Sequence, residues 1–252
     1  MKGLPIKRTA ISSVLAFVLN IILVYVVYAL CRVVYVCENW STFSEGFSAL
    51  SIPKLIHGSW IFDNAGIIYT NLLYAVLMLL PFHLKERDGW QTVAKWVFMV
   101  FNSLAVVVNL ADAVYFKYTG RRTTTTVFQE FSHDDNLGGI FGAELLNHWY
   151  LVLIVIGIIV AMYYLYVKPT GQLRLTAIPQ YVKYYLLHLV CFVAFIPLAV
   201  FGIRGGLTRA VRPITISNAN QYVNRPTEAA IVLNTPFSMI RTIGKNVYKD
   251  PK

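Results

Sequence analysis

Charged residues are scarce in this chain, and their scarcity excludes an ordinary soluble domain. Of the 252 residues, 13% are charged and 57% are hydrophobic, whereas a globular domain is about 25% charged and about 45–50% apolar. Cysteine is also rare. Cys31, Cys37 and Cys191 provide no disulfide framework, and Cys191 is expected to pack inside an apolar run. The mean hydropathy of +0.57 instead favours a membrane protein.

The formal net charge of +10 does not indicate a nucleic-acid partner. The 22 Lys and Arg residues lie mostly in short segments between apolar runs and in the C-terminal tail, which is how positive charge encodes membrane topology. An aromatic and basic binding face is missing from the pattern. The first apolar run is too long for a cleavable signal peptide and lacks a small-residue cleavage site after it.

Five long apolar runs predict an all-α fold: a polytopic bundle of five transmembrane helices with interfacial helices and a short helical tail. Each run is close to the ~20 residues that a bilayer requires. The predicted spans are 10–30, 61–82, 96–118, 149–167 and 184–203. A short interfacial helix broken at Pro53 is expected within 41–60, and surface helices are expected at 123–130 and 140–146. Residues 1–203 are therefore predicted to form the membrane domain, and residues 204–252 an extracytoplasmic tail.

The distribution of positive charge predicts the orientation. With a cytoplasmic N-terminus, nine Lys and Arg fall on the inner side in short segments and five fall in the two longer outer loops, so the positive-inside rule favours this topology. The inner set is Lys2, Lys7, Arg8, Lys85, Arg87, Lys95, Lys168, Arg174 and Lys183, and the outer set is Arg32, Lys54, Lys117, Arg121 and Arg122. Five spans then place the tail outside.

Polar residues on the third span are the first candidate site. Asn102, Asn109 and Asp112 recur at intervals of seven and three, so they share one face of a helix. A carboxylate inside a span is costly unless it is paired. Arg204 is the preferred partner of Asp112 and Arg32 is the alternative, because both arginines lie at the outer ends of their spans. A substrate-binding role for this face stays open beside the structural ion pair.

Other polar groups carry weaker signals. The outer loop holds Glu130, His133, Asp134, Asp135, Glu144 and His148, but their spacing matches no metal motif and a solvated turn explains part of them. We therefore predict no metal site and no catalytic residue. Thr123–Thr126 supplies hydroxyls without a recognisable base. His188 lies within the last span, where it can relay protons or simply pack with a bonded neighbour.

The tail contains helix signals and arginines. Thr235 followed by Pro236 predicts a helix start with Thr235 as its N-cap, and Gly244 is placed to end that helix. A second short helix is expected from about 224 to 233. These pieces should lie on the outer leaflet or against the bundle. The arginines at the membrane boundary are candidates for lipid or phosphate contact, since a guanidinium grips phosphate in bidentate fashion; unspecific contact with headgroups is the alternative. They are Arg204, Arg209 and Arg212.

Several short motifs carry a resemblance to a known family. They are Arg204-Gly205-Gly206, Arg212-Pro213-Ile214, Ser217-Asn218-Ala219, Tyr222, the run from Val232 to Ser238, Arg241-Thr242, and Asp112 with Tyr115, Phe116 and Tyr118. This set resembles the membrane region and linker of bacterial sulfatase-like proteins of the lipoteichoic-acid-synthase-like family, which are related to phosphoethanolamine transferases. The motif likeness is concentrated in residues 201–242.

The resemblance implies a parent enzyme of the alkaline phosphatase superfamily in the bacterial cytoplasmic membrane. Such enzymes transfer phosphoglycerol or phosphoethanolamine from a phospholipid through a covalent Thr intermediate at a divalent metal (Mn, Mg or Zn). The catalytic domain of that family is absent from this sequence, so no catalytic Thr or metal ligand transfers to any residue here. The expected partners are phosphatidylglycerol or phosphatidylethanolamine and the missing catalytic domain, and the chain alone is expected to be inactive.

Two other classes remain open. A membrane subunit or sensor without catalytic activity needs no further domain. A transporter is less favoured, because it needs polar breaks at the midplane and usually an internal repeat, whereas the polar residues here collect toward the outer face.

Overall fold

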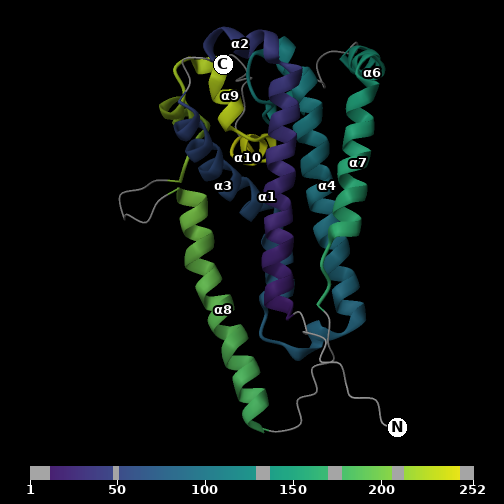
Figure 1. Cartoon of the computed structure of the whole chain (residues 1–252), viewed down its shortest axis with the longest axis vertical. Helices are drawn as coiled ribbons and strands as arrows, with labels where there is room; N and C mark the ends of the chain where they lie inside the picture. The colour runs from purple at the N-terminus through teal and green to yellow at the C-terminus, as the bar shows by residue number, and fades with distance from the viewer. Residues whose placement is uncertain (1–11, 48–50, 129–136, 170–177, 206–212, 245–252) are drawn as a thin grey trace, which may run out of the picture.

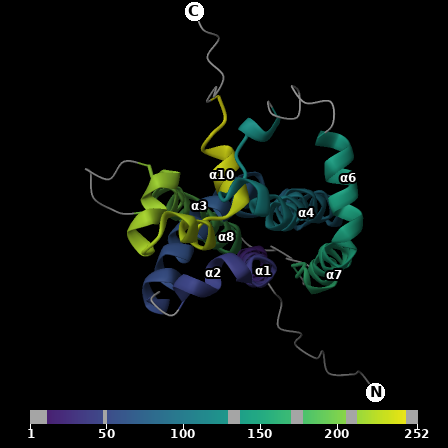
Figure 2. The ribbon, with the colours of Figure 1, turned by 90° about the horizontal axis from the view of Figure 1, so that it is seen from above.

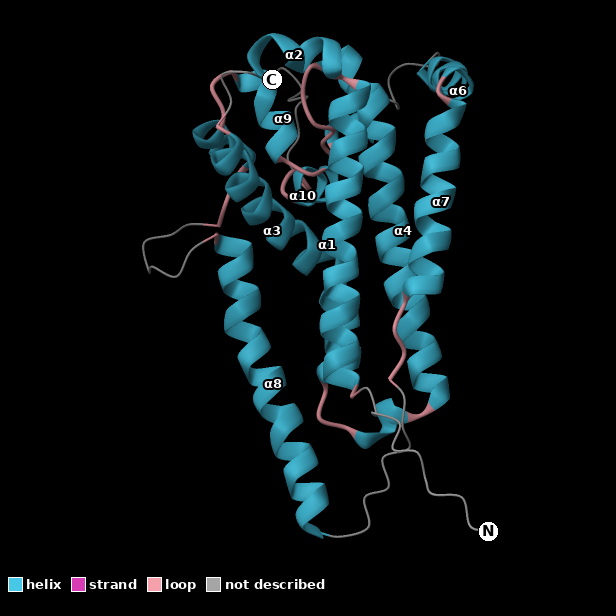
Figure 3. Ribbon diagram, in the orientation of Figure 1, coloured by secondary structure: helices cyan, strands magenta, loops and turns pink. Residues whose placement is uncertain are grey.

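The first long helix, α1 (Ser13–Glu38), begins at a side-chain cap and is long enough to cross a bilayer. The Ser12 hydroxyl accepts a hydrogen bond from the Leu15 N–H at 3.2 Å, which satisfies one of the unpaired donors at the helix start. The computed structural model describes residues 12–47, 51–128, 137–169, 178–205 and 213–244, and over these residues all regular structure is helical (Figure 3).

Four further long helices follow α1 and are joined by shorter elements. In chain order the elements are α2 (Trp40–Phe47), α3 (Ile52–Leu79), η1 (His83–Glu86), α4 (Asp88–Thr119), α6 (Leu137–Asn147), α7 (Trp149–Leu165), α8 (Ile178–Arg204), η2 (Ile216–Tyr222), η3 (Pro226–Glu228), α9 (Ala229–Val232) and α10 (Thr235–Ile240). Pro53 stands in the first turn of α3 and so begins that helix. The predicted break at this residue is therefore wrong, while the helix predicted at 140–146 is confirmed within α6.

The long helices form a bundle around α1, α3 and α4 (Figures 1 and 2). These three pack on one another, α8 packs on α3, and α7 packs on α4. A polar pair ties α3 to α4 inside the apolar core: Asn71 and Asn102 exchange side-chain hydrogen bonds of 3.0 and 2.8 Å. Large apolar side chains cover the outer faces of the helices, as expected for surfaces that meet lipid tails.

Within the described ranges, four helices are long and apolar enough to span a membrane: Ser13–Glu38, Ile52–Leu79, Asp88–Thr119 and Tyr181–Arg204. The predicted helical class is confirmed, and these four helices match four of the five predicted spans in length and composition. The remaining predicted span, 149–167, corresponds to α7, which has 17 residues and is about 25 Å long. It remains a prediction.

The chain leaves α7 in an extended conformation that is held by the side chain of Asn20. The Asn20 Oδ1 accepts from the Val167 N–H and its Nδ2 donates to the Val167 carbonyl, each at 2.9 Å. Its second N–H donates to the Tyr74 hydroxyl at 2.8 Å. The fully buried Asn20 amide thus provides hydrogen bonds for both the N–H and the carbonyl of Val167. Non-helical backbone at membrane depth requires such partners.

We name the two ends of the bundle by what lies there. The tail end is where α1 and α4 finish and the residues 213–244 pack. The far end is where α1 begins and η1 connects α3 to α4 (Figure 1).

Candidate functional site

The tail folds into the bundle at the tail end. α10 packs against both α3 and α4, and α9 packs against α3, as the yellow segment in Figures 1 and 2 shows. Phe237 is fully buried and meets Phe62 of α3 edge-on, with ring centroids 5.1 Å apart. Of the two placements predicted for the tail, packing against the bundle is therefore correct for residues 213–244.

An ion pair between α1 and α3 holds the end of α9. The Arg32 guanidinium binds the Asp63 carboxylate in bidentate fashion, with both N–O distances at 2.6 Å. Its Nε also donates to the Ile231 carbonyl at 2.8 Å, and a second nitrogen donates to the Val232 carbonyl at 3.3 Å. The last carbonyls of a helix lack hydrogen-bond donors within the helix, and Arg32 provides donors for two of them.

A second ion pair is more fully buried and binds another carbonyl of α9. Arg122 contacts the Asp112 carboxylate at 3.1 Å, and both side chains are at most 2% exposed. The Arg122 Nε donates to the Ala230 carbonyl at 2.8 Å, and its guanidinium lies 3.4 Å from the Tyr35 ring centroid. Two arginines thus cap the carbonyls at the end of α9, and each is neutralised by an acid from a different helix.

This pairing corrects the sequence prediction. Asp112 was expected to pair with Arg204 or Arg32, but its partner is Arg122, and Arg32 binds Asp63. Arg204 is exposed at the end of α8. The physical reason lies at Gly120, which adopts a left-handed conformation (φ 63°) and ends α4, so that the chain turns back and brings Arg122 beside its own helix.

The carboxylate of Asp112 also begins the tail helix. It accepts the Thr235 hydroxyl at 2.8 Å and the Thr123 N–H at 2.8 Å, and the Thr123 hydroxyl bonds to the same group. Asn109 accepts the Thr235 N–H at 3.0 Å. The predicted polar face of the third span is therefore confirmed as a face, because Asn102, Asn109 and Asp112 are all buried.

Asn234, rather than Thr235, is the N-cap of α10. Its Oδ1 accepts the Phe237 N–H at 2.9 Å, while its Nδ2 donates to the Phe62 carbonyl at 2.9 Å and to Asp63 at 3.0 Å. The predicted cap is one residue late because Thr235 is engaged by Asp112 and Asn109. The predicted helix end at Gly244 is too late, because α10 ends at Ile240 with Arg241 as its C-cap; Gly244, with a positive φ of 77°, lies in the turn that follows.

Glycines on α3 make room for the tail. A Cβ on Gly66 would lie 2.5 Å from the Asn234 Oδ1, and a Cβ on Gly58 would lie 2.6 Å from the Tyr222 ring. The two glycines are eight residues apart and so face the same side of α3. Any larger residue at either position would push the tail away.

Of the remaining candidate residues, those that the structure describes lie apart from this cluster. Arg209 and Arg212 lie outside the described residues, as do Glu130, His133, Asp134 and Asp135. Glu144 and His148 lie at the surface near Glu38, which pairs with Lys117 at 2.6 Å and with His148 at 3.4 Å. Among the described residues, no three His, Cys, Asp or Glu side chains gather as metal ligands.

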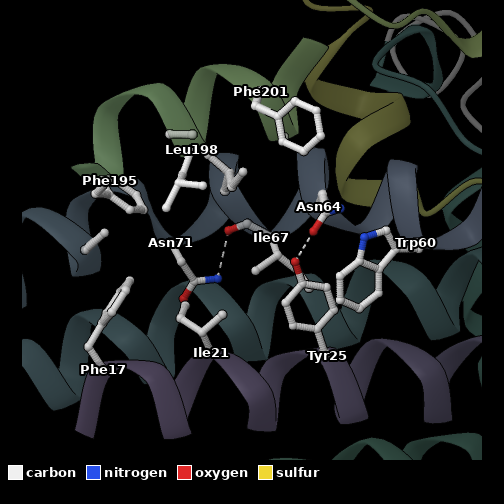
Figure 4. A pocket seen from close by; sticks show the side chains of 14 residues that line it. Phe17, Ile21, Tyr25, Trp60, Asn64, Ile67, Asn71, Phe195, Leu198 and Phe201 are labelled. Atoms are coloured by element: carbon white, nitrogen blue, oxygen red, sulfur yellow. Dashed lines mark hydrogen bonds between the residues drawn. The ribbon is translucent and has the colours of Figure 1, made fainter. Parts of the chain in front are cut away.

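Two cavities lie along the seam between α1 and α3. The tail-side cavity, about 540 Å³, is walled by α1, α2 and α3 and reaches Arg32 and Asp63. The central cavity, about 340 Å³, is walled by α1, α3 and α8 (Figure 4). Both are lined mainly by apolar side chains, which is typical of sites for apolar ligands.

A stacked aromatic pair separates the two cavities. Tyr25 and Trp60 line both, with ring centroids 5.0 Å apart and an interplanar angle of 15°. Figure 4 shows the two rings side by side at one end of the central cavity, with the Tyr25 hydroxyl bonded to Asn64. The two rings therefore lie where the cavities meet.

The combined seam is long and apolar, and its charges are already paired. On α1 it extends from Phe17 to Cys37, which corresponds to about 30 Å at about 1.5 Å per residue, close to the ~30 Å hydrocarbon thickness of a bilayer. Arg32 directs its hydrogen bonds to Asp63 and the tail. The seam therefore suits an acyl chain better than a phosphate.

Comparison with known proteins gives no relative. A scan against protein-family models, a search of curated proteins and a search of solved structures each found no match. The fold and the site define the class. In the part of the chain that the structure describes, this is a helical protein with four helices long and apolar enough to span a membrane, closed at one end by a tail that two ion pairs hold in place.

Proposed function

We propose that this chain is the membrane anchor and lipid-access domain of a bacterial envelope enzyme that transfers a phospholipid headgroup, phosphoglycerol or phosphoethanolamine, to an extracytoplasmic acceptor. The motif resemblance described above motivates the reaction class. In this proposal α7 completes five spans, the N-terminus is cytoplasmic and the tail is extracytoplasmic, in the bacterial inner membrane.

One observation carries the lipid-access role: the apolar seam between α1 and α3 runs beside the tail. Its tail-side cavity is bounded by Ile231 of α9 as well as by Arg32 and Asp63. A lipid chain in this cavity would place its headgroup at the tail end, close to residues 213–244. A catalytic domain joined to the tail would then meet the headgroup at a fixed height.

The metal of this reaction class does not fit the residues described here. A divalent ion needs several oxygen or nitrogen ligands that converge on one point, and the described part of the chain does not offer such a group. We therefore derive no metal-dependent step in this chain. The purified chain should show no turnover of fluorescent phosphatidylglycerol or phosphatidylethanolamine with added Mn²⁺ or Zn²⁺.

A cavity-filling variant tests the lipid site. Ala29 lines the tail-side cavity, so Ala29→Trp should reduce the phosphatidylglycerol or phosphatidylethanolamine that stays bound to the purified protein in native mass spectrometry. Ala161→Trp is the matched control, because Ala161 is exposed on α7 and outside both cavities. Equal lipid retention by wild type and Ala29→Trp would contradict the proposed site and favour a membrane subunit or sensor that does not handle lipid.

A further inference from the structure

A second polar cluster lies at the far end of the bundle, remote from the tail. Ser13 of α1, Glu86 of η1, and Tyr184 and His188 of α8 meet there. The Ser13 hydroxyl lies 3.1 Å from Glu86 Oε1 and 3.2 Å from His188 Nε2. The Tyr184 hydroxyl lies 2.9 Å from the same Glu86 oxygen. Ser13 is fully buried, and His188 is 3% exposed.

The tautomer of His188 is fixed by its other nitrogen. His188 Nδ1 lies 2.8 Å from the Tyr184 carbonyl oxygen, which can only accept. Nδ1 therefore carries a proton and donates it. In a neutral imidazole Nε2 would then be an acceptor facing the Ser13 hydroxyl.

Counting hydrogens shows that the neutral arrangement is one proton short. A serine hydroxyl has a single proton to donate, yet Ser13 faces two acceptors, His188 Nε2 and the Glu86 carboxylate. Tyr184 donates its own proton to Glu86 and cannot supply the missing one. With neutral His188 and ionised Glu86, one of the two Ser13 contacts would join an acceptor to an oxygen lone pair in a buried site, which is unfavourable.

We propose that Ser13, Glu86 and His188 form a buried proton-binding site that joins α8 to α1 and η1. With one added proton every contact is satisfied. Either His188 is doubly protonated and donates to Ser13, which donates to Glu86, or Glu86 is protonated and donates to Ser13, which donates to His188. The proton moves between the two ends through the serine hydroxyl, and both forms have the same net charge.

Other ionisable groups lie near this site. Lys85 of η1 is fully buried, donates to the Met78 carbonyl of α3 at 2.9 Å and lies 6.0 Å from the Tyr184 ring centroid. Cys191 of α8 is close enough to Lys85 to interact with it electrostatically. Glu86 is half-buried and so gives the proton a route to water.

Loss of the proton has a mechanical consequence. α8 packs mainly on α3, and the cluster fastens its first half to α1 and η1 at the far end. Without the proton, Glu86 and His188 Nε2 compete for the single Ser13 hydrogen, so this junction weakens. The site thus makes the attachment of α8 sensitive to pH, independently of the proposed lipid role.

Nitrogen NMR of histidine-labelled protein locates the proton. The chain has five histidines, and His188→Gln identifies the His188 signals by their loss. At pH 7 we expect either both His188 nitrogens protonated, or a neutral His188 with a protonated Glu86 carboxyl detected by infrared spectroscopy and abolished in Glu86→Gln. A neutral His188 together with an ionised Glu86 would overturn the proposal.

Two variants separate the proton site from general stability. Ser13→Ala removes the relay, so the shared proton should be lost at pH 7 while the protein stays folded. Ser12→Ala is the matched control: Ser12 is exposed and caps the same helix, so it should leave the His188 signals unchanged. If Ser13→Ala keeps the wild-type titration of His188, the serine is not part of the site.

Discussion

The hydroxyl of Thr235 donates to the carboxylate of Asp112 at 2.8 Å, across 123 residues of sequence. Arg122 donates to the same carboxylate oxygen, Oδ2, at 3.1 Å and also donates to the Thr235 hydroxyl oxygen at 3.2 Å. The tail is therefore bonded to a buried ion pair near the tail end of α4, and its position depends on that pair.

The first prediction concerns the Arg122–Asp112 pair. Asp112→Asn should destabilise the protein by about 3–5 kcal/mol, because it leaves Arg122 as a buried charge without its counter-ion. Denaturation in detergent measures the change. Lys117→Met is the control, since Lys117 is 42% exposed in its pair with Glu38 and such pairs contribute about 0–1 kcal/mol.

A double-mutant cycle identifies the partner of Asp112. Asp112→Asn combined with Arg122→Gln should deviate from additivity by more than about 0.5 kcal/mol, whereas the combination with Arg204→Gln should be additive within that limit. Coupling to Arg204 instead of Arg122 would contradict the pairing described here.

The second prediction concerns the contact between Gly66 and Asn234. Gly66→Ala should cost about 1–3 kcal/mol by overpacking and should loosen the tail, because the added Cβ overlaps the Asn234 amide. Ser238 is fully buried in α10. In a cysteine-free background, a cysteine introduced as Ser238→Cys should therefore react faster with a thiol reagent when Gly66→Ala is present than when Gly66 is kept. Gly157→Ala is the control, because a Cβ there meets nothing within 4 Å. An unchanged reaction rate would show that α10 does not depend on this close approach.

The third prediction is a pH dependence that arises from Lys85. Burial lowers the pKa of Lys85 from 10.5 to about 8. Between these values the unfolded chain holds a proton that the folded protein has released, so the free energy of unfolding should rise as the pH increases from about 8 to 10.5, by about 3 kcal/mol in total. Below pH 8 both states are protonated and this contribution is constant. Lys85→Met should remove the rise, which denaturation curves across this pH range would reveal; an identical rise in the variant would assign it to another group.

The fourth prediction tests the orientation of the bundle. In intact cells and a cysteine-free background, a cysteine at Gln221 in the tail should react with an impermeant thiol reagent, whereas one at Asp88 at the far end should react only after permeabilisation. Both positions are exposed. Labelling of position 88 in intact cells would reverse the proposed topology.

The sequence was sufficient for features that depend on local pattern. Long apolar runs determine the helical class, and the seven- and three-residue spacing determines that Asn102, Asn109 and Asp112 share a buried face. The same rule that makes an unpaired acid costly in a span correctly indicated a partner for Asp112, and it applies equally to Asp63.

The identity of the partners could not be predicted in this way. Arg122 reaches Asp112 because Gly120 reverses the chain, and Arg32 meets Asp63 because α1 and α3 pack side by side; both facts depend on three-dimensional packing. The sequence left the placement of the tail open between the outer leaflet and the bundle, since residues 229–233 are apolar but far too short to span a membrane. The signal that could have indicated it is the pair of glycines on α3, eight residues apart on one face.

The bonds between Arg32 and the end of α9 constrain how the protein is made. Arg32 and Ile231 are 199 residues apart, so at about 5–20 residues per second the ribosome needs about 10–40 s to supply the carbonyls that this arginine binds. During that interval the charged groups of α1, α3 and α4 already occupy their helices without the tail. Arg32 and Asp63 can already pair with each other, but the N–H groups that Arg32 directs to the tail must bond to water or to the insertion machinery until the tail arrives.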